Sequence, residues 1–236
     1  MNQNSILSII VPVYNEINTI EQLINRLESV SLRMYEKQII IVDDYSSDGT
    51  RELLLQLQKK KKNYNFKFHN VNRGKGSAIR TGLRYAIGLY VIIQDGDLEY
   101  NPQDIGKLLN IAHENNLDVV FGSRTLNKNN KSHHSGYRFL LGGIFLTFLT
   151  NMLYGIKISD EPTCYKLIKR NVLLSLNLSC ERFEFCPEVT AKISKKGLII
   201  TDVPIDYYPR RRNEGKKINW VDGIEAIWTL IKLRLD

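Results

Sequence analysis

The sequence predicts an α/β fold in which a mostly parallel central sheet is flanked by helices. Through the first half of the chain, short apolar runs alternate with stretches whose apolar residues recur at helical spacing. This alternation is typical of βαβ units. No repeat period and no long linker divides the 236 residues. We therefore expect a single domain over residues 1–236, with residues 1–125 and 126–236 as its two halves.

Each element of the first half is expected from a local pattern. Apolar faces at helical spacing begin at Ile20, Leu53 and Ile105, and small residues open a further helix over Ser77–Ala86. The run Lys59–Lys62 suits the negative end of a helix dipole. The expected strands are Leu7–Val13, Ile39–Asp43, Phe66–Asn70, Tyr90–Asp95 and Asp118–Gly122.

The composition excludes several classes of protein. Hydrophobic residues make up 43% and charged residues 25% of the chain, which excludes wholesale disorder. Cys164, Cys180 and Cys186 are an odd set without CxxC spacing, so neither a disulfide scaffold nor a zinc site is expected. A reducing compartment fits best. The first apolar run is too short for a secretory signal.

Basic residues are concentrated in the second half of the chain. Residues 1–125 hold 15 basic and 14 acidic side chains, whereas residues 126–236 hold 18 and 11, so the halves carry +1 and +7. An anionic membrane, a phosphorylated substrate or a nucleic acid would each match this charge.

Two apolar segments of the second half suggest contact with a membrane surface. Phe139 to Ile158 approaches the length of a membrane span, but Thr147, Asn151 and Lys157 interrupt it, so we expect a helix that lies on the membrane. An ordinary buried helix would show nearly the same pattern. The final helix carries an apolar face of Trp220, Ile224, Ile227, Trp228, Ile231 and Leu235, which suits a membrane interface or the core.

A pair of carboxylates follows the expected strand that starts at Tyr90. Asp95 and Asp97 are separated by one glycine, and strand ends are where open α/β sheets bind ligands. Two such carboxylates can hold one Mg²⁺ or Mn²⁺ ion, which would neutralise a diphosphate leaving group. The alternative is a simple Asp-Gly turn.

Two other polar segments have competing explanations. Asp43 closes its strand and could contact a base or a ribose, whereas Ser47 or Asp48 is explained by capping of the next helix. The segment Arg73–Ala78 fits neither a dinucleotide fingerprint nor a Walker phosphate loop. Its glycines indicate a close approach either to a ligand or to a neighbouring segment.

Several motifs together resemble the inverting family 2 glycosyltransferases of GT-A fold. More narrowly, the chain resembles the branch that transfers mannose or glucose to dolichyl phosphate or polyprenyl phosphate. The similarity runs from about residue 6 to the end. The first set of motifs is Val11–Glu16, Val42–Thr50, Asn72–Gly76 and Asp95–Asp97, and the narrower set is Gly122–Arg124, Asp160–Lys166, Phe185–Glu188 and Val203–Ile205.

The resemblance implies roles for individual residues. Asp95 and Asp97 match the metal and diphosphate motif, and Arg124 matches an arginine near the diphosphate or the acceptor phosphate. Glu99 replaces a frequent glutamine and adds a possible oxygen ligand. The positions that match nucleotide-holding residues are Pro12, Tyr14, Glu16 and Asp43.

The segment Tyr208–Lys217 resembles a basic loop that closes over donor phosphates. Either Arg210 or Arg212 matches its arginine, and either Lys216 or Lys217 its lysine. Five cations so close together repel one another unless phosphates meet them, although a solvated loop is the alternative.

Asp160 matches the position of a general base in relatives that use a hydroxyl acceptor. A phosphate monoester has a second pKa near ~6, so it is already a nucleophile at neutral pH. Asp160 would then only orient the acceptor or Lys166.

The expected activity is transfer of a hexose from a nucleotide diphosphate sugar, GDP-mannose or UDP-glucose, to a polyprenyl phosphate, with inversion. The enzyme would bind peripherally to the cytoplasmic face of a membrane, and its oligomeric state is left open. One alternative is a soluble family 2 enzyme acting on a saccharide or protein hydroxyl. A second is a nucleic-acid-binding protein, which lacks any matching motif.

Overall fold

One seven-stranded sheet runs through both halves of the chain. The computed structural model describes residues 5–127, 137–210, 217 and 220–236. The strand order is β3-β2-β1-β4-β6-β5-β7. The strands are β1 (Ile6–Val13), β2 (Glu36–Asp43), β3 (Asn65–Phe68), β4 (Tyr90–Ile93), β5 (Val119–Ser123), β6 (Lys166–Lys169) and β7 (Thr201–Pro204).

Most neighbouring strands are parallel, as the sequence predicts. β1 pairs with both β2 and β4 in parallel, and only β6 runs antiparallel to its two neighbours. All residues of β1 and β4 are buried. Strands covered on both faces are expected to be continuously apolar, which explains the runs in the sequence.

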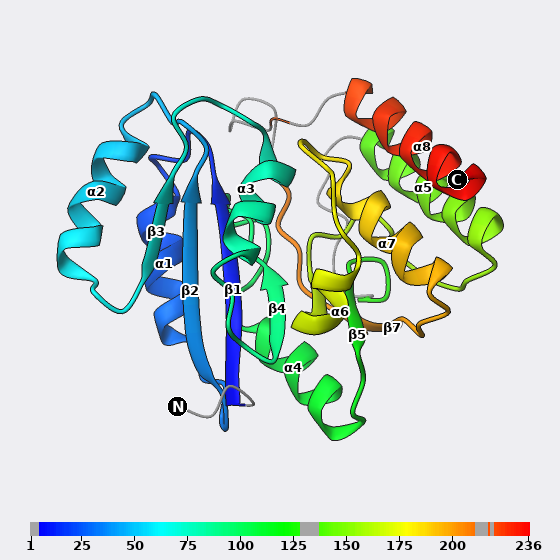
Figure 1. Cartoon of the computed structure of the whole chain (residues 1–236), viewed down its shortest axis with the longest axis horizontal. Helices are drawn as coiled ribbons and strands as arrows, with labels where there is room; N and C mark the ends of the chain where they lie inside the picture. Colours follow the sequence, from blue (N-terminus) through cyan, green and yellow to red (C-terminus); the bar gives the residue numbers. More distant parts are fainter. Residues whose placement is uncertain (1–4, 128–136, 211–216, 218–219) are drawn as a thin grey trace.

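Helices cover both faces of the sheet, and Figure 1 shows α3 in front of the strands and α1 behind them. Apolar residues at helical spacing on α1 and α4 are the ones that are buried. The helices are α1 (Ile20–Ser29), α2 (Thr50–Lys60), α3 (Lys75–Leu83), α4 (Asp104–Glu114), α5 (Tyr137–Tyr154), α6 (Arg170–Ser175), α7 (Phe185–Lys195) and α8 (Trp220–Leu235).

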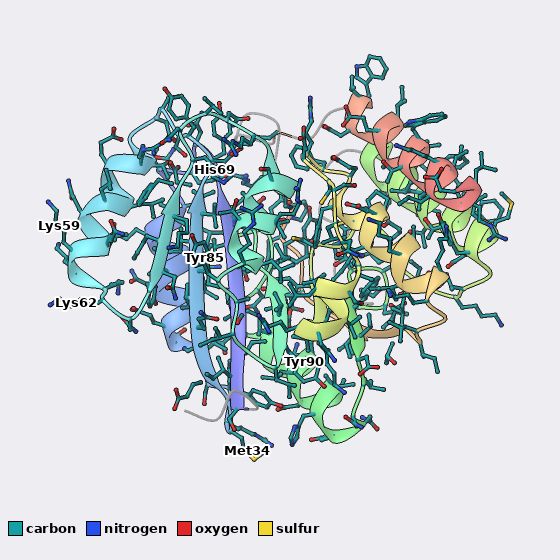
Figure 2. All side chains as sticks on the ribbon, viewed as in Figure 1. Met34, Lys59, Lys62, His69, Tyr85 and Tyr90 are labelled. Atoms are coloured by element: carbon teal, nitrogen blue, oxygen red, sulfur yellow. The ribbon has the colours of Figure 1, made fainter. Side chains whose placement is uncertain are left out.

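Helices α5 and α8 lie side by side outside α7, at the upper right of Figure 1. Among the side chains that the structure describes, they share a small buried apolar cluster with α7, and partly buried residues of α5 and α8 pack against it. The buried members are Leu146, Ala191, Ala226 and Leu230. Many of their other apolar side chains remain exposed, as Figure 2 shows for the outer rim of α8. Over residues 140–154, α5 therefore buries one face and exposes the other, and its contact with a membrane stays a prediction.

Several boundaries differ from those predicted. β4 ends at Ile93, two residues before Asp95, so the carboxylates lie on the loop beyond the strand. Helix α3 begins at Lys75 and ends at Leu83, earlier than expected at both ends. The lysine run does fall at the end of α2.

Candidate active site

A cavity of about 2410 Å³ opens at the carboxyl ends of the parallel strands. The loops that follow β1, β2 and β4 meet there because parallel strands end at the same edge of a sheet. The cavity continues along α3 and reaches α5 and α8. Residues from both halves of the chain therefore line one space.

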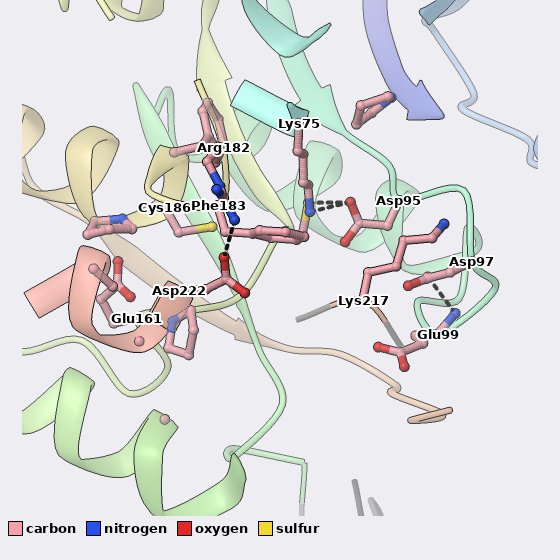
Figure 3. A pocket seen from close by; sticks show the side chains of 18 of the residues that line it. Lys75, Asp95, Asp97, Glu99, Glu161, Arg182, Phe183, Cys186, Lys217 and Asp222 are labelled. Carbon is pink, nitrogen blue, oxygen red and sulfur yellow. Dashed lines mark hydrogen bonds and ion pairs between the residues drawn. The ribbon is translucent and has the colours of Figure 1, made fainter. Parts of the chain in front are cut away.

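The acidic segment after β4 lies on the wall of this cavity (Figure 3). Asp97 is half-buried in this wall, and burial together with the charges of Asp95 and Glu99 raises its pKa to about 7. The Asp97 carboxylate also accepts a hydrogen bond from the backbone N–H of Glu99 at 3.1 Å. Three carboxylates this close together repel one another, so the segment favours a bound cation.

Lys75 supplies one such cation. Its Nζ atom lies 2.5 Å from Oδ1 of Asp95. Burial acts to lower the pKa of Lys75, but the neighbouring Asp95 carboxylate outweighs this effect and the pKa lies well above its usual value. The Cys164 thiol donates to the same Asp95 oxygen at 3.2 Å. Asp95 is thus held in place from two sides.

The glycines around Lys75 explain how it reaches this position. Gly74 has a φ of +89°, and a Cβ there would lie 2.4 Å from the carbonyl oxygen of Glu181. The backbone N–H of Gly76 donates to the carbonyl of Arg182 at 2.9 Å. Of the two explanations for these glycines, close packing is the one that the structure displays.

Glu16 gathers the two described cations of the basic loop. Both of its carboxylate oxygens accept hydrogen bonds from Arg210, at 2.9 and 3.1 Å, and Lys217 Nζ lies 2.6 Å from Oε1. Arg210 also lies 3.3 Å from Asp97. Both ends of the loop are therefore attached to acidic side chains of the cavity, while Arg212 and Lys216 lie outside the described residues.

Glu99 anchors the segment that leads into this loop. Its Oε2 accepts a hydrogen bond from the Tyr207 hydroxyl at 2.5 Å, and its Oε1 accepts one from the backbone N–H of Arg210 at 2.7 Å. Through these contacts Glu99 holds the segment around Tyr207 and Arg210 in place, whereas its sequence position suggested an oxygen ligand for a metal.

Arg124 and Asp160 form a tight pair at the border of the two halves. The guanidinium donates to both Asp160 oxygens at 2.7 Å, and the Arg124 backbone N–H donates to one of them at 2.9 Å. The Arg124 guanidinium also lies 4.9 Å from the centre of the Tyr207 ring. Because both of its oxygens bind the Arg124 guanidinium, the Asp160 carboxylate fixes the orientation of that arginine.

The residues expected to hold a nucleotide divide into two groups. Pro12, Tyr14 and Glu16 line the cavity, whereas Asp43 is fully buried beside Arg51, with 3.3 Å between the charged atoms. Asp44 lines the cavity instead, and it accepts hydrogen bonds from two backbone N–H groups, those of residues 73 and 74. Nucleotide contact by Asp43 stays a prediction.

A divalent ion fits this site only with help from the substrate. Among the residues that the structure describes, no three His, Cys, Asp or Glu side chains are grouped to hold a metal. Mg²⁺ is commonly bound by one or two carboxylates together with substrate phosphates and water. Asp95 and Asp97 supply the two carboxylates, provided that Lys75 and Arg210 give way.

Sequence reasoning identified most of this wall but missed two of its contacts. In the sequence Lys75 stands out only as part of a glycine-rich segment, and Tyr207 does not stand out. The signal for Lys75 was its place between two glycines, which allow the close approach described above. Tyr207 gave no signal, because its partner Glu99 is 108 residues away.

Comparison with known proteins agrees with this architecture. The model of the family described as glycosyl transferase family 2 matches residues 8–176. The chain is 30% identical to the UDP-N-acetylglucosamine–dolichyl-phosphate N-acetylglucosaminyltransferase of Methanococcus voltae, over 98% of this chain and 97% of that protein. It is 28% identical to a dolichyl-phosphate beta-glucosyltransferase of Trichomonas vaginalis, over 96% and 72% of the two chains.

Solved structures share the fold at lower identity. Glucosyl-3-phosphoglycerate synthase of Mycobacterium tuberculosis bound to UDP superposes with a TM-score of 0.73 at 18% identity, covering 98% of this chain and 80% of that one. The same enzyme with Mn²⁺, UDP and phosphoglyceric acid gives 0.69 at 18% identity, covering 98% and 78%. The GT-A fold predicted from the motifs is confirmed, and the chain belongs to glycosyl transferase family 2.

Proposed function

We propose that this glycosyltransferase moves a hexose from a nucleotide diphosphate sugar to a polyprenyl phosphate, with inversion at the anomeric carbon. One observation carries the proposal. A single cavity joins the acidic strand-end loops to the exposed apolar helices α5 and α8. A water-soluble donor and a lipid acceptor can therefore reach the same centre from opposite sides.

The donor would bind over β1 and β2. Pro12, Tyr14 and Glu16 line the cavity where a nucleotide would lie, and Asp43 supports the neighbouring loop. GDP-mannose and UDP-glucose remain the expected donors, and UDP-N-acetylglucosamine joins them because a relative is named for it.

Asp95 and Asp97 would hold a divalent ion against the diphosphate. A bound Mg²⁺ or Mn²⁺ ion supplies Lewis-acid stabilisation of the departing nucleoside diphosphate. Arg210 and Lys217 would help to neutralise the diphosphate, since both already lie at this wall in contact with its acidic side chains. Arg212 belongs to the same proposed loop.

The acceptor phosphate would attack without a protein base. At neutral pH a phosphate monoester is largely dianionic, so no proton has to be removed. Asp160 fixes the Arg124 guanidinium through both oxygens, which leaves the arginine oriented toward an anion in the cavity. Asp160 is thus a positioning residue in this proposal.

Helices α5 and α8 would lie on the cytoplasmic face of a membrane. In the described part of the chain no helix is long and apolar enough to cross a bilayer. Phe148, with 63% of its surface exposed, and both tryptophans of the chain belong to these two helices. Exposed apolar side chains of this kind beside basic groups are typical of interfacial helices.

A two-part experiment tests the proposal. The protein is incubated with Mg²⁺ or Mn²⁺, each labelled donor and a polyprenyl phosphate, and the lipid is extracted. We expect label in the extracted lipid when polyprenyl phosphate is present, and none when polyprenyl alcohol replaces it. Label transferred only to saccharide or peptide hydroxyls would overturn the proposal in favour of a hydroxyl acceptor.

Vesicles test the membrane contact separately. Because Trp220 and Trp228 are the two tryptophans of the chain and are both exposed on α8, their fluorescence reports on this surface. A blue shift on addition of anionic vesicles is expected. An unchanged spectrum would contradict peripheral binding through α8.

A further inference from the structure

The cavity wall between the acidic segment and α8 includes one arginine, Arg182, that is not among the residues expected to bind the donor. Figure 3 shows Arg182 directed toward Asp222, with Lys75 to one side of it and the ring of Phe183 near the end of Lys75. Lys75 Nζ lies 5.8 Å from the centre of the Phe183 ring. All of these residues line the same cavity as Asp95.

The backbone of Arg182 is fixed from three directions. Its carbonyl accepts a hydrogen bond from the Gly76 N–H at 2.9 Å, and its own N–H donates to Glu184 at 2.9 Å. The preceding carbonyl, of Glu181, accepts from the Ser77 N–H at 3.0 Å. The start of the Arg182 side chain is therefore set relative to α3 and Lys75.

The guanidinium of Arg182 is, by contrast, only loosely engaged. Its side chain is 54% exposed, and within the described residues its contacts are long, 3.5 Å to Asp222 and 3.8 Å to Glu225. A guanidinium carries five N–H donors, which match phosphate oxygens in pairs. Arg182 thus presents unused donors to the cavity.

The carboxylate of Asp222 explains why Arg182 faces this way. The Asp222 side chain is almost fully buried at the start of α8, and Arg182 is a cation within reach of it. A buried carboxylate attracts a neighbouring guanidinium and so favours its staying close. Asp222 therefore acts through Arg182 as a positioning residue.

Beyond Arg182 the cavity wall becomes apolar. Ile144 and Leu146 of α5 and Ile224 and Ile227 of α8 line it. A ligand that occupies this arm would place its anionic group at Arg182 and Lys75 and its hydrocarbon against α5 and α8. The order of charge and apolar wall matches an isoprenoid chain that ends in a phosphate.

We propose that Arg182, together with Lys75, binds the phosphate monoester of the polyprenyl acceptor and makes the enzyme select a phosphate over an alcohol. The inference rests on the proposed function and adds the residue that binds the phosphate of the acceptor. Arg182 contacts the substrate in this proposal, whereas Arg124 remains at the border with the donor.

Binding of a short acceptor tests the proposal without turnover. Geranyl monophosphate and geraniol are titrated into the full-length protein in dilute detergent without anionic lipid. The native protein should bind the phosphate at least about 10-fold more tightly than the alcohol. Arg182→Gln should weaken phosphate binding roughly 10–100-fold, the range for a hydrogen bond to a charged group, and leave binding of the alcohol and of UDP unchanged.

A matched variant controls for net charge. Arg234 is exposed near the end of α8 and does not line the cavity, so Arg234→Gln removes the same charge at a place outside the cavity. It should leave geranyl monophosphate binding unchanged. An equal loss in both variants would overturn the proposal, because the effect would then be long-range attraction.

The head groups of membrane lipids are a second source of phosphate. Vesicles of phosphatidylglycerol that contain no polyprenyl phosphate test whether Arg182 binds those head groups instead. If Arg182→Gln weakens vesicle binding but not binding of geranyl monophosphate, Arg182 meets membrane head groups and the proposal is wrong. If Arg182→Gln does not fold, Arg182→Lys retains the cation and is expected to lose phosphate affinity about 3–10-fold. Unchanged affinity in Arg182→Lys together with an unchanged preference over geraniol would also overturn it.

Failure of the two proposals can be told apart. If the native protein binds UDP but shows no preference for the phosphate, the proposed function itself fails, and this inference with it. If the native protein prefers the phosphate and Arg182→Gln keeps that preference, only the role of Arg182 is wrong.

Discussion

Two strands of the first half, β1 and β4, and two helices of the second half, α5 and α8, treat apolar side chains in opposite ways. β1 and β4 bury every residue within the sheet, so their apolar surface is satisfied inside the molecule. Helices α5 and α8 share only a small cluster with α7 and expose much of their apolar surface. Large exposed apolar patches mark sites of contact with another protein, a ligand or a membrane. Strands β1 and β4 of the scaffold half, residues 1–125, thus bury their apolar surface, whereas α5 and α8 of the second half leave apolar surface open for the lipid contact proposed above.

The largest expected effect comes from a carboxylate of the scaffold half. Asp97→Asn should lower transfer on the order of 10³-fold, or about 4 kcal/mol, because an amide cannot replace a charged ligand of the metal. Vesicle binding and thermal unfolding should not change, since Asp97 lies on a loop at the cavity wall.

Steady-state transfer at saturating Mn²⁺ checks this prediction. Asp118→Asn is the matched control, because Asp118 pairs with Lys169 and does not line the cavity. Near-normal transfer by Asp97→Asn would remove this residue from the metal site.

Two isoleucines allow a direct comparison of the halves. Ile10 of β1 is fully buried and Ile144 of α5 is 52% exposed. Ile10→Ala should lower the free energy of unfolding by about 2–5 kcal/mol, as large-to-small changes in cores do. Ile144→Ala should change it by no more than about 0.5 kcal/mol.

Urea unfolding measures the difference in free energy of unfolding between the two variants. For vesicle affinity we expect the opposite order, with the larger loss in Ile144→Ala. Ile144→Ala removes apolar surface that would enter the membrane, so its affinity for vesicles should fall several-fold. Ile10→Ala should bind vesicles like the native protein under conditions where it remains folded. Equal destabilisation by the two substitutions would mean that the α5 face is covered within the protein.

The predictable parts of the molecule are those encoded by local pattern. Continuous apolar runs identified β1 and β4, and the position of Asp95 and Asp97 after a strand placed them at the ligand edge of the sheet. β6 escaped prediction because its sequence, Lys-Leu-Ile-Lys, is short and begins with a lysine. Lys166 is buried all the same, since its Nζ donates to the Glu161 carbonyl at 2.8 Å and lies 3.8 Å from the centre of the Phe121 ring.

The site was predictable only in part, because its contacts join distant segments. Family motifs indicated Arg124 and Asp160, but nothing in the sequence indicated that they bind one another across 36 residues. The same holds for Glu16 and Arg210, which are 194 residues apart. Such pairs depend on how the sheet brings its loops together, and the order of strands cannot be derived from any one segment.

The smallest expected effect concerns Asp160, which lies where the two halves meet. Glu161, the next residue, donates its backbone N–H to Thr147 of α5 at 3.0 Å. Because both Asp160 oxygens are occupied by Arg124, Asp160→Asn should cost about 10-fold in transfer through poorer orientation of that arginine. Loss of a general base would cost about 10²–10⁴-fold instead.

The pH dependence separates these two roles. A phosphate acceptor with a second pKa near ~6 becomes fully dianionic as the pH rises through that value, so transfer should fall on the acidic side in the native enzyme and in Asp160→Asn alike. Transfer measured from roughly pH 5 to 8 brackets that ionisation. If the acidic limb disappears in the variant and the loss exceeds about 10³-fold, the ionising group belongs to Asp160 and the acceptor is a hydroxyl. If the limb remains, the ionising group is the acceptor phosphate or Asp97, whose pKa is raised to about 7, and Asp160 acts as a positioning residue that removes no proton from the acceptor.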